Sequence, residues 1–216
     1  VTLSVTYGYT PISAHAYASY ALILCGDIGD IDMGYRYGQL AQRLLERFDA
    51  RELKPRTLMV VNNFVRHWKE HARETIYPLI ETYQLGMEVG DLEFAALALY
   101  VSSTLSFFTG SQLDQLEAEM RQHDEVLKRI RQSRALYMNG LYRQVVLNLM
   151  GRSSDPCALM GESFQEETMV PLHRASNDKT AMYYVYFNKL ILSYLFHKYA
   201  EAVDYAAMAE TYAASA

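Results

Sequence analysis

Small side chains recur at one helical spacing near both ends of this 216-residue chain, and this pattern constrains the fold more than any other feature. Near the C-terminus the small residues are Ala202, Ala206 and Ala209. Near the N-terminus the same spacing holds Gly34, Gly38 and Ala41. Steps of three and four residues place such side chains on one face of a helix. Glycine inside a helix costs up to about 1 kcal/mol relative to alanine. Two glycines on one face therefore predict a close approach to a neighbouring helix.

The C-terminal small residues belong to a predicted helix pair. An apolar segment from Tyr183 to Phe196 precedes a polar corner at His197 and Lys198, and the small residues follow from Tyr199. This arrangement resembles one tetratricopeptide unit, in which small residues let the second helix nest against the first. The resemblance implies that pairs stack, because one pair alone cannot bury its apolar face.

About five such pairs are predicted, at a period of about forty residues, which is close to that of other α-solenoids. The first pair ends in the helix that carries Gly34. In the second to fifth pairs the two helices span residues 56–68 and 72–87, 92–108 and 112–131, 134–150 and 159–175, and 179–196 and 199–213. Pro78 and Pro171 fall inside second helices, so these helices are expected to kink or to begin later. The prediction is an all-α, right-handed superhelix that forms one domain over residues 1–216.

Composition narrows the class of protein. Half of the residues are hydrophobic and 21% are charged, as is typical of a soluble globular chain. The net charge of −5 argues against nucleic acid as a partner. The longest nearly apolar stretch, 94–108, is shorter than the roughly 20 residues that span a bilayer, so no membrane partner is expected. Cys25 and Cys157 form no CxxC motif and no signal-peptide pattern opens the chain, so a cytoplasmic setting is expected. Because the chain begins with Val1, we expect it to be a segment of a longer protein.

Four sequence segments resemble a known family, and they span residues 24–35, 61–71, 90–95 and 142–152. They are similar to a helical segment of large multidomain signalling kinases of bacteria, best represented in cyanobacteria. In that family a protein-kinase-like domain and an AAA-type ATPase domain precede the segment, and GAF or PAS sensors with a histidine kinase or cyclase follow it. The resemblance implies a middle segment that binds an inducer or a partner and restrains the ATPase.

The catalytic motifs of that family are absent from this sequence. It contains no Walker A pattern, no His-Arg-Asp loop, no Asp-Phe-Gly and no histidine-kinase nucleotide box. Kinase or ATPase activity is therefore expected of the parent protein and not of this chain. No cofactor is expected either.

The inner face of the first helices is the predicted binding surface. The tetratricopeptide register places polar groups there on otherwise apolar helices, which is the lining that a groove for a peptide or a small ligand needs. These groups are Asn63, Arg66, His67, Tyr142, Asn148, Tyr184 and Asn188. An asparagine offers a peptide backbone both a donor and an acceptor, and Arg66 offers a carboxylate a fork of donors. The alternative is that these groups satisfy buried backbone between helix pairs.

Two other clusters contain residue types that can bind a metal. His67 and His71 are one helical turn apart, as in some zinc sites, but no third ligand is evident. Asp27, Asp30 and Asp32 alternate as in calcium loops, yet the closing glutamate is missing. We expect these acids to cap corners and helix starts, and we predict no metal.

Three short patterns resemble catalytic groups without completing them. Gly161-Glu-Ser163 lacks the second glycine of a nucleophile elbow. Cys157 has no histidine in its phrase and is expected to be a small buried thiol. The carboxylates of Glu166 and Glu167 are expected to be solvated on a charged helix.

The leading functional prediction is a protein-interaction and signal-relay module that binds a peptide or a partner domain. One alternative is a small-molecule sensor with a pocket lined by Asn63, Arg66, Tyr142 and Asn188. A second is a metal-dependent hydrolase centred on His67 and His71. A third is a rigid arm that has no partner of its own.

Overall fold

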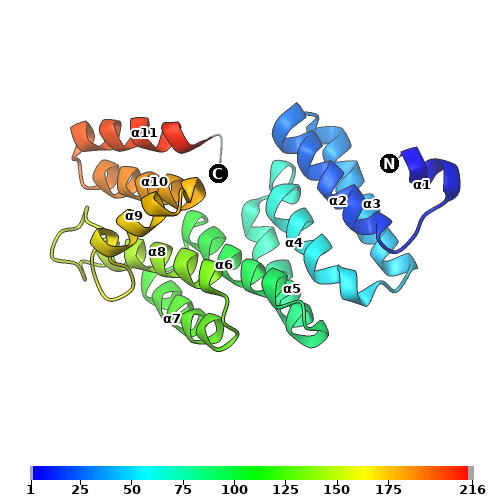
Figure 1. Ribbon diagram of the computed structural model, residues 1–216, viewed down its shortest axis with the longest axis horizontal. Coiled ribbons are helices and arrows are strands. Elements are labelled where there is room, and N and C mark those ends of the chain that lie inside the picture. The colour runs from blue at the N-terminus through cyan, green and yellow to red at the C-terminus, as the bar shows by residue number, and fades with distance from the viewer. Residues whose placement is uncertain (1, 214–216) are drawn as a thin grey trace. The chain divides into compact units, whose positions relative to one another are not determined.

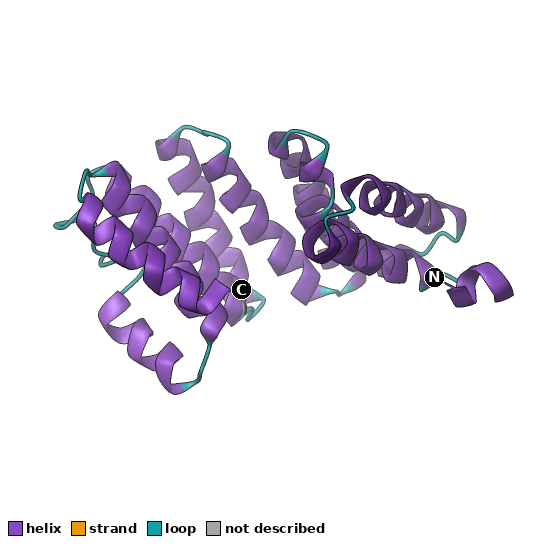
Figure 2. Ribbon diagram, turned by 90° about the horizontal axis from the view of Figure 1, so that it is seen from above, coloured by secondary structure: helices purple, strands orange, loops and turns teal. Residues whose placement is uncertain are grey.

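The computed structural model describes residues 2–213, and throughout this range the regular structure is helical (Figure 2). Among these residues the only β-type pairing is an isolated antiparallel bridge between Met160 and Gln165. The predicted all-α class is therefore confirmed. Residues 1 and 214–216, which the predicted domain also covers, lie outside the described part of the chain.

The longest connections between the α-helices are residues 150–165 before α9 and residues 65–75 before α5 (Figure 1). The α-helices are α1 (Thr2–Tyr7), α2 (Ser13–Ile23), α3 (Ile31–Arg47), α4 (Lys54–Phe64), α5 (Ile76–Val89), α6 (Leu92–Phe108), α7 (Leu113–Arg129), α8 (Ser133–Leu149), α9 (Glu166–Ala175), α10 (Lys179–Leu195) and α11 (Tyr199–Ala213). A π-helical turn, Leu24–Ile28, continues α2. Short 3-10 turns at Arg51–Leu53, Arg66–Trp68 and Ala72–Thr75 flank α4 and precede α5.

Most predicted helix boundaries agree with these elements. The predicted helices 92–108 and 199–213 coincide with α6 and α11. The helix predicted from residue 72 becomes α-helical only at Ile76, which places Pro78 in its first turn, where a proline is tolerated. The prediction was wrong for residues 159–165, because α9 begins at Glu166 and the preceding residues form a loop.

The described chain divides into two compact units. Unit 1 runs as far as Ser111 and includes 126–135, and unit 2 comprises 112–125 and the residues from 136 onward. In unit 1, α2 packs on α3 and α5 packs on α6, while α4 contacts α2, α5 and α6. In unit 2, α10 packs on both α9 and α11. The prediction of a single domain stays a prediction.

Each unit encloses its own apolar clusters. One cluster of unit 1 joins α2, α3 and α4 and includes Tyr17, Leu44 and Val61. Another joins α4, α5 and α6 through Met59 and Leu79 among others. In unit 2, Met182, Tyr186 and Ala209 form a cluster against which Val170 of α9 also packs. Burial of this apolar surface is the main favourable contribution to folding.

The predicted small-residue positions lie where helices approach closely. Gly34 is buried, and a methyl group added to it would lie 2.3 Å from Sγ of Cys25 in the π-helical turn. The other two small residues of this set on α3 are buried as well. In unit 2, Ala202 and Ala209 are buried and Ala206 is partly exposed. Small side chains therefore mark helix contacts in both units.

Candidate functional site

Two adjoining cavities in unit 1 form the strongest candidate site, and they lie where α3, α4 and α5 meet. The larger, of about 450 Å³, is lined by Gln42, Leu58, Asn62, Arg66, Pro78, Glu81, Gln84, Leu85 and Glu88. The smaller, of about 260 Å³, is lined by Tyr35, Gly38, Gln39, Gln42, Val61, Val65, Arg66 and Glu70. Because Gln42 and Arg66 line both, we treat them as one site and call it the Arg66 site.

Arg66 is the charged centre of this site. Asn62, Arg66 and Glu70 stand four residues apart, so the end of α4 and the following turn present them on one side. The Arg66 Nε atom donates to both carboxylate oxygens of Glu70, at 3.1 and 3.0 Å, and its Nη2 atom donates to the same carboxylate. The Tyr35 hydroxyl donates to Glu70 at 2.7 Å. The hydrogen bonds from Arg66 lower the pKa of Glu70, and the bond to Glu70 raises the pKa of Arg66.

Asn62 is the most informative side chain of the Arg66 site. It is 2% exposed, and its Oδ1 atom accepts a hydrogen bond of 2.9 Å from Nη1 of Arg66. Since a guanidinium only donates, this bond fixes which end of the amide carries the oxygen. The amide NH₂ group is left with no acceptor among residues 2–213, although the side chain lines the larger cavity. Because this NH₂ group borders the cavity, a molecule bound there could accept a hydrogen bond from it.

The rim of the larger cavity is polar and reaches solvent. Glu81, Gln84 and Glu88 of α5 are exposed. Glu88 pairs with Arg51 at 2.7 Å, and both side chains are more than half exposed. Glu81 has no ion pair with any residue of the described chain. One wall of the same cavity is apolar and is made by Leu58, Pro78 and Leu85.

Three of the predicted site residues, Asn63, Arg66 and His67, lie in this region, and one of these three lines the cavities. Arg66 lines both of them. Asn63 is partly buried and His67 is exposed, and neither is among the lining residues of the Arg66 site. The lining comes from the adjacent side of α4, where Asn62 lies next to Asn63 in sequence. The role predicted for Asn63 and His67 stays a prediction.

The other four predicted residues lie in unit 2, and two of them are wholly buried. Asn148 is 0% exposed, and its Nδ2 atom donates to the carbonyl groups of Pro156 and Ala158, at 3.1 and 2.6 Å. Asn188 is also 0% exposed and donates to the carbonyl of Tyr184 at 2.8 Å, one turn earlier in α10. The rings of Tyr142 and Tyr184 meet edge to face at 6.4 Å. The contacts of Asn148 thus correspond to the alternative reading, in which such groups satisfy buried backbone.

Hydrogen bonds made by the side-chain amides of α8 explain why residues 159–165 form a loop. Gln144 of α8 donates to Oδ1 of Asn148 at 2.8 Å. Its Oε1 atom accepts from the backbone nitrogens of Ser163 and Phe164, at 3.1 and 3.3 Å. Buried backbone groups must find partners somewhere, and here the side chains of α8 supply them instead of a helix. Gln144 is 0% exposed, so this loop is anchored in the interior of unit 2.

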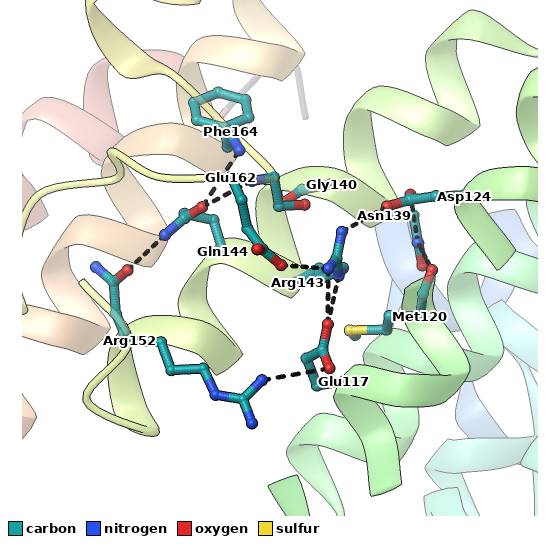
Figure 3. A network of polar contacts seen from close by, with 12 residues as sticks. Glu117, Met120, Asp124, Asn139, Gly140, Arg143, Gln144, Arg152, Glu162 and Phe164 are labelled. Atoms are coloured by element: carbon teal, nitrogen blue, oxygen red, sulfur yellow. Dashed lines mark hydrogen bonds and ion pairs between the residues drawn. The ribbon is translucent and has the colours of Figure 1, made fainter. Parts of the chain in front are cut away.

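Beside this loop, a buried ion cluster joins α7 to α8 (Figure 3). Arg143 of α8 donates to Glu117 from Nε and Nη2, at 2.9 and 2.7 Å, and to Asp124 from Nη1 at 3.3 Å. The three side chains are each less than a tenth exposed. Glu162 of the loop also accepts from Arg143, at 2.5 Å. Asn139 donates to Asp124 at 2.8 Å. Because every charge is partnered, the cluster serves to hold α7, α8 and the loop together.

The remaining predicted clusters have local roles. Asp30 is the N-cap of α3 and accepts from the backbone nitrogen of Met33 at 3.1 Å, as expected of that acid. The Nδ1 atom of His71 accepts from the backbone nitrogen of Arg73 at 3.1 Å. Among the residues that the structure describes, no group of three histidine, cysteine, aspartate or glutamate side chains could hold a metal ion.

Cys157 and Glu166 also have defined surroundings. Cys157 is buried, as predicted, and burial raises the pKa of its thiol. Glu166 is not solvated as predicted, because both of its oxygens accept from Nζ of Lys189, each at 2.7 Å. Its side chain is only 17% exposed, since α9 packs on α10.

No protein-family model, curated protein or solved structure matches this chain. The resemblance to bacterial signalling kinases therefore stays a prediction. Across the described residues, no helix combines the length and the apolar character needed to cross a membrane.

The sequence analysis missed Asn62 and the α5 side of the site. The four-residue spacing of Asn62, Arg66 and Glu70 was a signal that could have revealed them, because groups so spaced share a helix face. The contributions of Gln84 and Glu88 could not be found in this way. They depend on how α5 lies beside α4, and no local pattern determines that.

Proposed function

We propose that this chain is a helical-repeat interaction module that binds an extended segment of a protein partner in the Arg66 site. The observation that carries the proposal is the orientation of the Asn62 side chain. Arg66 binds its amide oxygen, and the NH₂ group of the same amide has no partner beside the larger cavity. A peptide carbonyl is an acceptor that would complete this group. The amides of Gln42 and Gln84 line the same cavity and can pair with further backbone groups.

The proposal includes the predicted right-handed superhelix of about five pairs, as tetratricopeptide-like solenoids have, and the stacking of successive pairs in unit 1 supports it. Both α2 and α6 pack on α4, so the first helices of successive pairs follow one another. The second helices α3 and α5 line the Arg66 site, and α4 contributes Leu58 and Asn62 to the lining. A solenoid of this kind offers a partner an extended surface along its length.

The resemblance to signalling kinases extends the proposal to a relay role. Occupancy of the Arg66 site would be passed to ATPase and sensor domains in a parent protein, in a cytoplasmic setting. The proposal assigns the chain binding and no catalysis. Its partners are proteins or peptides, including domains of the same parent chain.

A small-molecule sensor is the second candidate, and the size of the cavity favours it. Ligand pockets have volumes of about 300–1,000 Å³, and the larger cavity of about 450 Å³ falls in this range. Of the residues predicted to line a pocket, Asn63, Arg66, Tyr142 and Asn188, Arg66 lines this cavity, and the role of the other three stays a prediction. Thermal-shift screening with amino acids, organic acids and nucleotides tests this candidate. A shift that is lost on Asn62→Leu would favour it over a peptide.

Peptide selection tests the leading proposal. Random peptides displayed on phage are selected on the purified chain, and synthetic copies are then titrated by fluorescence anisotropy. Asn62→Leu removes the NH₂ donor without adding a charge, and Arg66 keeps its bonds to Glu70. We expect about a tenfold loss of affinity, the usual value of one hydrogen bond of this kind.

Asn63→Leu is the matched control, because Asn63 is the neighbouring residue but does not line the cavities. It should leave the affinity unchanged. Circular dichroism melts of both variants separate loss of binding from loss of folding. The proposal fails when no selected peptide depends on Asn62.

A further inference from the structure

We infer that the segment bound at the Arg66 site is basic, with a lysine or arginine side chain that reaches Glu81. This inference rests on the proposed function and specifies its partner. Its first support is the charge of the lining residues. Across the two cavities the charged lining residues are Arg66 with Glu70, Glu81 and Glu88. Negative groups therefore outnumber positive ones threefold.

The existing pairs leave one carboxylate available. Glu70 is fully engaged by Arg66 and also accepts from Tyr35. Glu88 has Arg51, in a pair whose two members are more than half exposed and which is therefore weak. Glu81 has no cationic partner among residues 2–213. A ligand cation can thus meet Glu81 without breaking any ion pair.

An anionic ligand would face the opposite situation. Its natural partner would be Arg66, the sole cation among the described lining residues. The guanidinium already donates from Nε and Nη2 to Glu70 and from Nη1 to Asn62. An anion would have to displace Glu70 and would then bring a second negative charge close to it. Like charges at such a distance repel, so the geometry disfavours this class of ligand.

The shape of the cavity also matches a basic side chain. Leu58, Pro78 and Leu85 supply an apolar wall, while the exposed carboxylate of Glu81 lies on the rim. Lysine and arginine carry an apolar stem and a charged end, and they commonly lay the stem on apolar surface while the end stays in a polar place. The free NH₂ group of Asn62 would meanwhile hold a carbonyl of the same segment.

Charge reversal at the rim tests the inference. Peptides selected from the random phage library are sequenced and titrated against Glu81→Lys at low and at physiological ionic strength. We expect lysine or arginine to be enriched at one position of the selected peptides. We also expect Glu81→Lys to lower their affinity about tenfold at low salt, with a smaller effect at higher salt because exposed charges are screened.

Glu93→Lys is the matched control, since Glu93 is an exposed residue of α6 that does not line the Arg66 site. It changes the net charge equally and should leave the affinity within about twofold of the unchanged chain. Neutral or acidic peptides that require Asn62 but ignore Glu81→Lys would overturn the inference and leave the proposed function standing. Absence of any Asn62-dependent peptide would overturn both.

Discussion

Single residues in this chain matter most where a charge or an amide is buried. Arg143 bonds Glu117 closely, at 2.7 Å, and Asp124 at 3.3 Å, and together the three residues place three charges in the interior of unit 2 (Figure 3). Such a cluster adds little net stability compared with an apolar core, whereas the loss of one member leaves the others uncompensated. Asn62 differs from these residues, because its NH₂ group has no hydrogen-bond partner and the side chain lines a cavity.

Replacement of Arg143 by methionine tests this view of the cluster. The variant leaves Glu117 and Asp124 buried without their cation, so we expect it to lose about 3–5 kcal/mol of unfolding free energy. Urea denaturation followed by circular dichroism measures the change. Arg152→Met is the control, since Arg152 is 56% exposed and lies 3.6 Å from Glu117. That change should cost less than about 1 kcal/mol. Equal effects of the two variants would contradict the buried-cluster account.

His123 of α7 should make the stability depend on pH. Burial lowers the pKa of this histidine from its ordinary value of 6.5 to about 4. In the unfolded chain this histidine binds a proton near pH 6.5, whereas in the folded chain it stays neutral until about pH 4. Unfolding therefore takes up a proton in this window, so stability falls as the pH is lowered from 6.5 to 4 and levels off below.

His123→Gln removes this titration. Between pH 7 and pH 4.5 we expect the unchanged chain to lose about 2 kcal/mol more than the variant, a value reduced for partial exposure of the ring. Chemical denaturation at a series of pH values measures the difference. Desolvation also lowers the pKa values of His15 and His67, but both histidines are present in the two proteins, so their contributions cancel. Parallel pH profiles of the two proteins would contradict the prediction.

At the scale of the elements, glycine determines how closely helices approach. Gly34 lets α3 lie against the π-helical turn after α2, where no methyl group fits beside Cys25. Gly86 has the same role on α5, since a methyl group there would lie 2.7 Å from Cβ of Ala95 on α6. The Gly34 contact lies within one helix pair and the Gly86 contact joins two successive pairs, so in both places the absence of a side chain allows the close approach.

Gly34→Ala should destabilise the chain although alanine is the better helix former. The added methyl group collides with Cys25, and overpacking of this kind costs about 1–3 kcal/mol. The gain in helix propensity offsets up to about 1 kcal/mol of this. Gly26→Ala is the control, because a methyl group at Gly26 meets no atom within 4 Å. Urea denaturation should show a loss for the first variant alone. An unchanged midpoint for Gly34→Ala would show that α3 can move away.

At the scale of the whole molecule, the division into two units is the main result. Each unit has its own apolar clusters, and the Arg66 site lies wholly within unit 1 while the Arg143 cluster lies wholly within unit 2. Proteins built from successive helix pairs owe much of their stability to neighbouring contacts, so parts of the chain can open separately.

Hydrogen exchange of Gly34→Ala tests this independence. We expect faster exchange across α2, α3 and α4, because their shared cluster is weakened. The amides of α10 and α11 should exchange as in the unchanged chain. Mass spectrometry of peptic fragments resolves these segments. An equal loss of protection in α10 would instead mean that the chain opens as one cooperative unit.

Local patterns in the sequence were enough to predict the helices and the places where they touch. Helical periodicity and sparse glycine and proline are local properties, which is why α6 and α11 were predicted residue by residue and the small residues were recognised as contacts. Tertiary structure decided the rest. The loop before α9 exists because Gln144 and Asn148 bind its backbone from α8, and the cavity exists because α5 brings Glu81 and Gln84 beside Asn62. Which side chains from separate helices meet depends on how the helices pack, and no short stretch of sequence contains that information.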